Sequence, residues 1–347
     1  MKNQQSSDVL RTREKADQLY NYRKNYRFHP GSRDVYRFIA AIFPCLLGVG
    51  PLYQLIAELK ERRTLVPPGR IVDLDGSRVH VSSEGSGTPT VVLEAGLGGM
   101  SSAWGWIQPE AAKFSHVFSY DRAGLGWSTE DSVPKTAQRV AGRLRALLQK
   151  CGVLPPYVLV GHSMGGLFIR VFADLYPDEV AGMVLIDAVH PEQDRRSQAI
   201  NIHTRSGFKF LRAVPLLVVL GYIRLSGFFN AWGDGLPPHH AAHASAFLSS
   251  YRHLKTTLDE SLAWEALCAE ALQTGGLGNR PLAVVTACKD VLPGHPELQR
   301  ELLALSSNST HFAITGADHL TLVTNRTHAL SVVAAIRHVV DMAGRPR

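Results

Sequence analysis

The feature that most constrains the fold is the run Gly161-His162-Ser163-Met164-Gly165, in the middle of the 347-residue chain. Apolar residues 157–160 lead into it, and the apolar pattern of residues 167–173 behind it predicts a helix. A strand, a sharp turn and a helix in this order expose a serine hydroxyl above the edge of a sheet. The two glycines are needed because a Cβ at either position would collide with the neighbouring strand or helix. Ser163 is therefore the candidate nucleophile, although ordinary glycine-rich turns also contain this pattern.

The segments around this turn predict an α/β architecture. Near-continuous apolar strands separated by helical crossovers run from Thr90 to Asp187, which is typical of a parallel sheet covered on both faces. Two short alternating runs around Asp75-Gly76 predict a hairpin ahead of them. The strand pattern stops near His190 and returns at residues 281–287 and 310–315.

The break in the strand pattern predicts an insertion. Residues 190–280 have helical signals interrupted by proline and glycine, and no strand alternation. We expect them to form a helical cap over the sheet. A closing helix is expected from about Asn325, with an apolar face every three to four residues.

A serine hydroxyl needs a base to take its proton, and the base needs a carboxylate to orient it. In a sheet of this order, the partners should follow as an acid and then a histidine, each just after a strand. Asp290 follows the strand that ends at Ala287, and His319 follows the strand that ends at Thr315. The predicted catalytic residues are therefore Ser163, Asp290 and His319. Asp187 also ends a strand and is the alternative acid.

Two backbone N–H groups are candidates for stabilising an oxyanion. The Met164 N–H lies at the start of a predicted helix, where the helix dipole favours negative charge. The second donor should come from the loop after the third strand, which points to the Leu97 N–H. Glycine loops of this kind are also common as simple tight turns.

The sequence resembles the α/β-hydrolase fold, in the serine-nucleophile branch with a helical cap (the AB hydrolase-1 type). The stretches that support the resemblance are 94–99, 121–126, 161–166, 287–290 and 316–319. It covers roughly residues 70–345 and implies a mostly parallel eight-stranded sheet flanked by helices. Ala95 departs from the pattern, because many members have histidine there. Dehalogenases and epoxide hydrolases of this fold use aspartate as the nucleophile, which argues against those activities here.

The predicted function is that of a serine hydrolase that cleaves an acyl bond, by default a carboxylic ester, through an acyl-enzyme intermediate. Peptidase, lactonase, thioesterase and cofactor-free haloperoxidase activities remain alternatives of the same fold. A non-catalytic, membrane-tethered binding protein is the alternative of another class. The expected partner is a small apolar acyl substrate, since aromatic and aliphatic residues gather between Phe208 and Trp232, although they could equally be cap core.

No cofactor or metal is required by this chemistry. His239, His240 and His243 have helical spacing but lack a carboxylate or an HExxH pattern, so we expect a solvated cap helix there. The four cysteines, at positions 45, 151, 268 and 288, have no metal-like spacing and are expected to be free, buried thiols.

The N-terminal segment has a composition of its own. The net charge of +7 is contained within the first 70 residues, so the rest of the chain is neutral, which argues against a nucleic-acid surface. We expect a basic arm over residues 1–37, a hydrophobic helix over 38–57 and a linker over 58–69. The uncharged run is about long enough to span a bilayer, with the N-terminus on the cytoplasmic side. A helix lying on the membrane or packed on the catalytic domain is the alternative.

Overall fold

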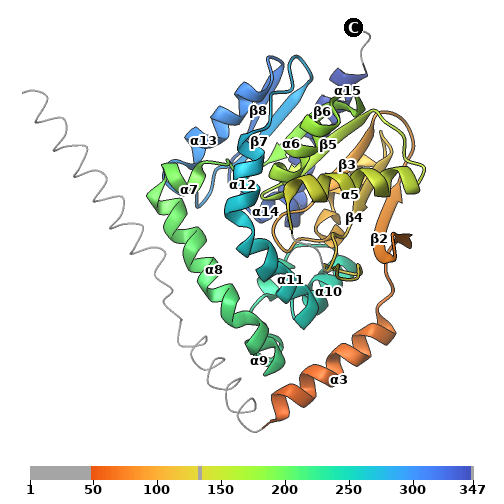
Figure 1. Ribbon diagram of the computed structural model, residues 1–347, viewed down its shortest axis with the longest axis vertical. Coiled ribbons are helices and arrows are strands. Elements are labelled where there is room, and N and C mark those ends of the chain that lie inside the picture. The colour runs from red at the N-terminus through yellow and green to blue at the C-terminus, as the bar shows by residue number, and fades with distance from the viewer. Residues whose placement is uncertain (1–47, 132–134, 345–347) are drawn as a thin grey trace, which may run out of the picture.

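The computed structural model describes residues 48–131 and 135–344, and these residues are organised around one eight-stranded sheet (Figure 1). The strand order is β1-β2-β4-β3-β5-β6-β7-β8. The strands are β1 (Arg70–Leu74), β2 (Ser77–Glu84), β3 (Thr90–Glu94), β4 (Val117–Tyr120), β5 (Tyr157–His162), β6 (Val180–Ile186), β7 (Leu282–Ala287) and β8 (Ser309–Ile314). The hairpin β1–β2 and the pair β2–β4 are antiparallel, and the other pairs are parallel. The predicted mostly parallel sheet is confirmed.

Helices cover both faces of the sheet because its strands are apolar on both sides. Within β5, Tyr157 and Leu159 pack against one face, while Val158 and Val160 pack against the other. The first face is covered by α5 (Ala137–Lys150) and α6 (Gly165–Leu175). The second face is covered by α4 (Ile107–Ala111) and α15 (Arg326–Ala343). Burial on both faces explains why these strands read as continuous apolar runs.

Six helices lie between β6 and β7, and we call them the helical insertion. They are α7 (Gln193–Arg196), α8 (Gln198–Val219), α9 (Tyr222–Ser226), α10 (Pro238–Phe247), α11 (Tyr251–Leu262) and α12 (Trp264–Leu272). The insertion has a small core of its own, in which Val214, Val218 and Phe229 pack with Met100 from the loop after β3. In Figure 1 it lies beside and below the strands, in green to teal. After β7 come α13 (His295–Glu301) and α14 (Thr321–Thr324), which flanks the loop after β8.

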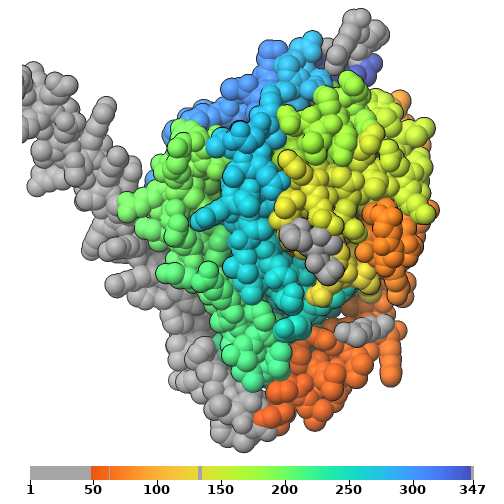
Figure 2. All heavy atoms as spheres, viewed as in Figure 1, coloured from red at the N-terminus to blue at the C-terminus, as the bar shows by residue number. Residues whose placement is uncertain are grey.

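The predicted membrane span over residues 38–57 is wrong. Its last residues form the start of α3 (Val49–Thr64), which continues into charged residues and occupies much of the predicted linker. Gln54 of α3 is buried and donates a hydrogen bond of 2.7 Å to the Ser249 carbonyl, so this helix packs on the insertion. Figure 2 shows α3, in orange, meeting the green and teal insertion.

The described residues contain no helix that is both long enough and apolar enough to cross a bilayer. The single-pass arrangement with a cytoplasmic N-terminus is therefore not supported. The predicted basic arm and the first part of the predicted span lie outside the described residues, as does Cys45. The three described cysteines, Cys151, Cys268 and Cys288, are free thiols.

Candidate active site

Ser163 lies in the sharp turn between β5 and α6, with a left-handed φ of 54°. The flanking glycines are required by close packing. A Cβ at Gly161 would lie 2.8 Å from the Gly165 carbonyl carbon, and a Cβ at Gly165 would lie 2.3 Å from the Glu94 carbonyl oxygen. The Ser163 N–H donates to the Ile186 carbonyl at 3.0 Å, which ties the turn to the end of β6.

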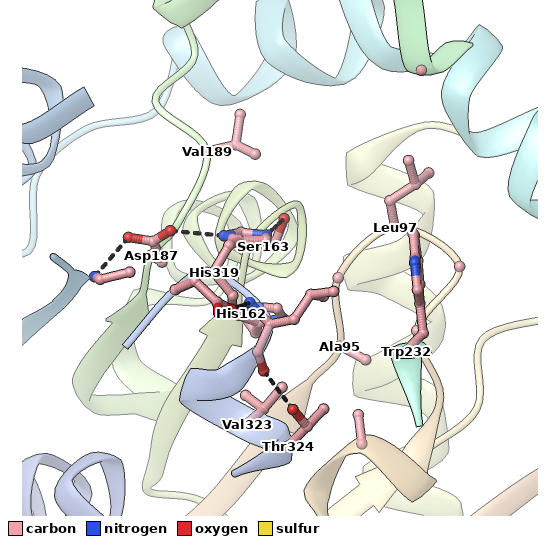
Figure 3. Close-up of a pocket in the computed structure, with 18 of the residues that line it drawn as sticks. Ala95, Leu97, His162, Ser163, Asp187, Val189, Trp232, His319, Val323 and Thr324 are labelled. Carbon is pink, nitrogen blue, oxygen red and sulfur yellow. Dashed lines mark hydrogen bonds and ion pairs between the residues drawn. The ribbon is translucent and has the colours of Figure 1, made fainter. Parts of the chain in front are cut away.

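A histidine from the loop after β8 reaches this serine (Figure 3). His319 Nε2 lies 3.0 Å from Ser163 Oγ, and His319 Nδ1 lies 2.7 Å from Asp187 Oδ2. The partners assign the tautomer: Nδ1–H donates to the carboxylate, and Nε2 accepts from the serine hydroxyl. The chain Asp187–His319–Ser163 has the hydrogen-bond order of a base held by an acid and facing a nucleophile.

The carboxylate of Asp187 is almost completely buried and has three donors. His319 donates to one oxygen, while His295 Nε2 at 2.9 Å and the Ala287 N–H at 3.0 Å donate to the other. Burial by itself would raise the pKa of this carboxyl, but the hydrogen bonds and charges of the two histidines lower the pKa well below its usual range. Asp187 is therefore a carboxylate at neutral pH.

The structure corrects the preferred choice of acid. The carboxylate that contacts His319 belongs to Asp187, the alternative, at the end of β6. Asp290, in the loop after β7, has a side chain that is 61% exposed and lies 3.9 Å from Lys289 Nζ. The physical reason is side-chain direction, because the Asp187 carboxylate is 3% exposed and faces His319 Nδ1, whereas the Asp290 side chain is exposed to solvent.

The candidate oxyanion donors lie on either side of the serine. The loop at Gly96 approaches Ser163 closely, since a Cβ on Gly96 would lie 3.0 Å from Ser163 Cβ. Among the described residues, the N–H groups of Leu97 and Met164 have no hydrogen-bond partner. Two unpaired donors beside a nucleophile could stabilise an alkoxide or a tetrahedral anion.

A cavity of about 710 Å³ opens over the hydroxyl of Ser163. Figure 3 shows Asp187 and Leu97 on opposite sides of it. Much of the wall is apolar, and the part that comes from the insertion includes Phe208, Phe210, Leu211, Phe228, Phe229 and Trp232. The aromatic residues that the sequence analysis singled out between Phe208 and Trp232 therefore face the cavity.

Sequence reasoning missed one polar residue that lines the cavity, His295, and two that hydrogen-bond to Gly98 from behind its wall, Glu260 and His253. His295, Glu260 and His253 follow no strand end, and the sequence contains no local signal for them. His162, which precedes the serine, lies with its ring centroid 4.7 Å from that of His319 and donates to the His319 carbonyl at 3.0 Å. Burial, together with His319, lowers the pKa of His162 to about 3, so it is a neutral packing partner at neutral pH.

The described residues contain no cluster of histidine, cysteine and carboxylate side chains that could hold a metal ion. The expectation of a solvated helix is wrong for His243, which is completely buried and packs edge-on against Trp127.

Comparisons with known proteins agree with this fold. A family model described as the alpha/beta hydrolase fold matches residues 89–229. One similar solved structure is a mutant of a Pseudomonas aeruginosa protein that is provisionally named an epoxide hydrolase. Its sequence is 19% identical to this chain and its TM-score is 0.66, and the match covers 81% of this chain and 99% of that protein. Cfl2 from Burkholderia cenocepacia is 20% identical with a TM-score of 0.56, over 78% of this chain and 95% of its own.

Curated relatives match shorter stretches. The uncharacterized protein YbdG of Bacillus subtilis is 32% identical over 144 residues, which is 41% of this chain and 44% of that protein. RutD of Azorhizobium caulinodans, provisionally named a carbamate hydrolase, is 34% identical over 110 residues, or 31% of this chain and 40% of RutD. The chain thus spans less than half the length of these relatives. The sheet, the serine turn and the family model that matches residues 89–229 together show that the described residues have the α/β-hydrolase fold.

Proposed function

We propose that the protein is a serine hydrolase that cleaves carboxylic esters of apolar acyl groups. The observation that carries the proposal is the hydrogen-bonded chain from Asp187 through His319 to Ser163, with spacings of 2.7 and 3.0 Å, at the floor of an apolar cavity. An alcohol with this base and this buried carboxylate can act as a nucleophile at neutral pH.

The reaction begins with attack of Ser163 Oγ on the acyl carbonyl, while His319 Nε2 takes the hydroxyl proton. The N–H groups of Leu97 and Met164 stabilise the resulting oxyanion, at roughly 3 kcal/mol for each donor. The bond to the alcohol oxygen then breaks, and His319 returns the proton to the leaving alkoxide. Water attacks the acyl-enzyme, gives its proton to His319, and the acid leaves as Ser163 recovers its hydrogen.

Asp187 acts on His319 throughout this cycle. Its buried carboxylate holds Nδ1–H in place and stabilises the positive charge that forms on the imidazole. The second pair of donors, from His295 and the Ala287 backbone, fixes the carboxylate plane. An acid with a lowered pKa stays ionised across the neutral range and does not compete for the proton.

The cavity supports an apolar acyl group as the substrate class. Its volume of about 710 Å³ lies within the usual range for small-molecule sites. The aromatic wall offers no charged partner for a polar acyl chain near Phe210 and Phe229. Hydrophobic burial would contribute about 0.8 kcal/mol for each methylene of the chain that leaves water.

An epoxide is a weaker candidate than an ester, although a structural neighbour is named for epoxides. Attack of a serine alkoxide on an epoxide would leave an ether, which water does not hydrolyse under these conditions. An aspartate nucleophile avoids this, because it leaves an ester. Ser163 occupies that position here.

The test is hydrolysis of p-nitrophenyl esters from acetate to palmitate, with Ser163→Ala as the control. We expect turnover with an optimum at a medium or long acyl chain, and loss of nearly all turnover in the variant. Labelling of Ser163 by a fluorophosphonate without ester turnover would favour another acyl substrate, such as a peptide, lactone or thioester. Neither label nor turnover would contradict the proposal and favour a non-catalytic binding role.

A further inference from the structure

The loop that contains the candidate oxyanion donor Leu97 is held by an unusual set of buried polar side chains. Arg122, from the loop after β4, donates from Nη2 to the Gly96 carbonyl at 2.6 Å and from Nη1 to the Ala95 carbonyl at 2.7 Å. The Gly96 carbonyl and the Leu97 N–H belong to the same peptide group. In a trans peptide these two groups point in opposite directions, so fixing the carbonyl also fixes the N–H.

The next two peptides of the loop, on either side of Gly98, are each held by one helix of the insertion, α11. The Gly98 N–H donates to Glu260 Oε2 at 2.9 Å, and His253 Nε2–H donates to the Gly98 carbonyl at 2.8 Å. His253 Nδ1 accepts from the Gly126 N–H at 3.0 Å, so both of its ring nitrogens are used in a neutral ring. Burial lowers the pKa of His253 to about 4, which agrees with that state.

Glu260 connects the hydrogen bonds that Arg122 makes to the loop with those that α11 makes to Gly98. It accepts from Arg122 Nε at 2.7 Å and from Nη2 at 3.1 Å, while Arg122 also donates to Glu94 at 2.6 Å. All three side chains are at most 5% exposed. Burial alone would lower the pKa of Arg122, but the charges of Glu260 and Glu94 raise it, so the guanidinium stays charged. The pair is therefore both desolvated and bidentate, a geometry that fixes direction as well as distance.

We propose that Glu260 and His253 of the insertion are positioning residues for the oxyanion donor at Leu97. They act through Arg122 and through the Gly98 peptide, and they touch neither substrate nor Ser163. The insertion then does more than cover the cavity, because α11 sets the direction of an N–H group that must meet the developing anion. This inference rests on the proposed serine hydrolase function.

The central test compares Glu260→Gln with Asp259→Asn, a matched change of carboxylate to amide on the same helix. The Asp259 side chain is 40% exposed and pairs with Lys255, one turn away on the same helix, at 2.9 Å. We expect Glu260→Gln to lower kcat by roughly 10- to 100-fold with KM changed by less than about threefold, because loss of a whole oxyanion donor costs about 10²- to 10³-fold. Asp259→Asn should keep the kcat of the wild-type enzyme.

Two further readouts separate positioning from simple loss of structure. Affinity for an alkylboronic acid, whose adduct with Ser163 places an oxygen in the oxyanion site, should fall in step with kcat. Amide hydrogen exchange of the peptide that covers residues 95–100 should speed up by at least about tenfold in Glu260→Gln, the factor expected from loss of one buried hydrogen bond. Exchange in β5 and α6 should not change.

His253→Gln serves as the second variant if Glu260→Gln fails to fold. It removes a hydrogen bond to Gly98 but leaves the ion pair of Arg122 with Glu260 in place. The inference is overturned if the variants have the kcat of wild type, or if loop exchange is unchanged. An active wild-type enzyme with unaffected variants would leave the proposed function standing. If the wild-type protein shows neither ester turnover nor fluorophosphonate labelling of Ser163, both the proposed function and this inference are contradicted.

Discussion

Ser163 and Asp187 share a backbone conformation that few non-glycine residues adopt, with φ of 54° and 42°. Such a conformation costs of order 1–3 kcal/mol and persists only where the surroundings determine it. In this protein the neighbouring strands hold both residues in that conformation, since the Ser163 N–H donates to the Ile186 carbonyl and the Asp187 N–H donates to the Val285 carbonyl at 2.7 Å. The ends of β5, β6 and β7 therefore lock the nucleophile and the acid to one another through backbone hydrogen bonds.

The choice of acid can be tested by changing each aspartate to asparagine. We expect Asp187→Asn to lower kcat by about 10⁴-fold, because an amide in place of the carboxylate holds the histidine in the wrong tautomer. Asp290→Asn is the matched control and should keep turnover within about twofold of wild type. Steady-state kinetics on one p-nitrophenyl ester is sufficient. A loss in Asp290→Asn as large as that in Asp187→Asn would show that the acid has been misassigned.

At this scale motif and order predicted Ser163 and His319, whose side chains the structure brings together, but the sequence favoured Asp290 over Asp187 as the acid. Both aspartates follow apolar strands, and the two strands are neighbours whose ends meet at one edge of the sheet. What distinguishes them is the direction of one side chain and the histidine that reaches it. His295, in the first turn of α13, donates a hydrogen bond to Asp187, and no sequence pattern predicts a contact of that kind.

At the scale of elements, α11 links the insertion to the sheet through buried polar groups, and His253 makes that link sensitive to pH. The pKa of His253 is about 4 in the folded protein because of burial, against an ordinary value of 6.5 in an unfolded chain. Between these values the unfolded chain binds more protons, so the free energy of unfolding falls as the pH falls from 6.5 toward 4. Above pH 6.5, His253 is neutral in both states and does not change how the free energy of unfolding depends on pH.

We therefore expect His253→Gln to flatten the dependence of stability on pH. The variant is less stable than wild type at pH 7, where it loses hydrogen bonds to Gly98 and Gly126. On acidification to pH 4 the wild-type protein should lose on the order of 3 kcal/mol more than the variant. Urea unfolding at pH 7, 5.5 and 4.5 measures this difference, and parallel curves for the two proteins would contradict it.

The helical elements were the least predictable part of the fold. The sheet strands are apolar and short, so their order along the chain predicted the parallel core and the place of the insertion. The apolar run before residue 57 had two physical outcomes, insertion into lipid or packing on protein, and composition does not separate them. The buried hydrogen bond of Gln54 to Ser249 favours packing on protein, and it joins residues 195 positions apart that no local pattern could connect.

At the scale of the whole molecule, the cavity is formed between two parts with different origins in the chain. The sheet edge provides the floor with Ser163, and the insertion provides all the Phe and Trp residues of the wall except Trp104. For the proposed hydrolase, the aromatic residues of the insertion help to set the size of the acyl group that fits, while Ser163, Asp187 and His319 follow strands of the sheet. Changes at the insertion residues that line the cavity, unlike changes at Glu260 and His253, should leave the proposed chemistry at Ser163 intact.

A larger side chain in the wall tests this division. Leu211→Trp should fill part of the cavity and move the optimum of the ester series toward shorter acyl chains, with a loss of about tenfold or more for palmitate and little change for acetate. A change of two to three methylenes corresponds to roughly 2 kcal/mol of apolar burial. Fluorophosphonate labelling of Ser163 at the wild-type rate is the control. An equal loss across all chain lengths would contradict this model of the cavity.

The position of Asp187 at the end of β6 has a consequence for how the proposed hydrolase could change its substrate. Residues 289–292, in the loop after β7, line the cavity, yet the carboxylate that orients His319 lies on another strand. Selectivity and reactivity are thus separated within a few ångströms of each other. A library of sequences at these four positions could be screened for new ester preferences while the nucleophile, base and acid remain unchanged, a freedom that an acid at position 290 would remove.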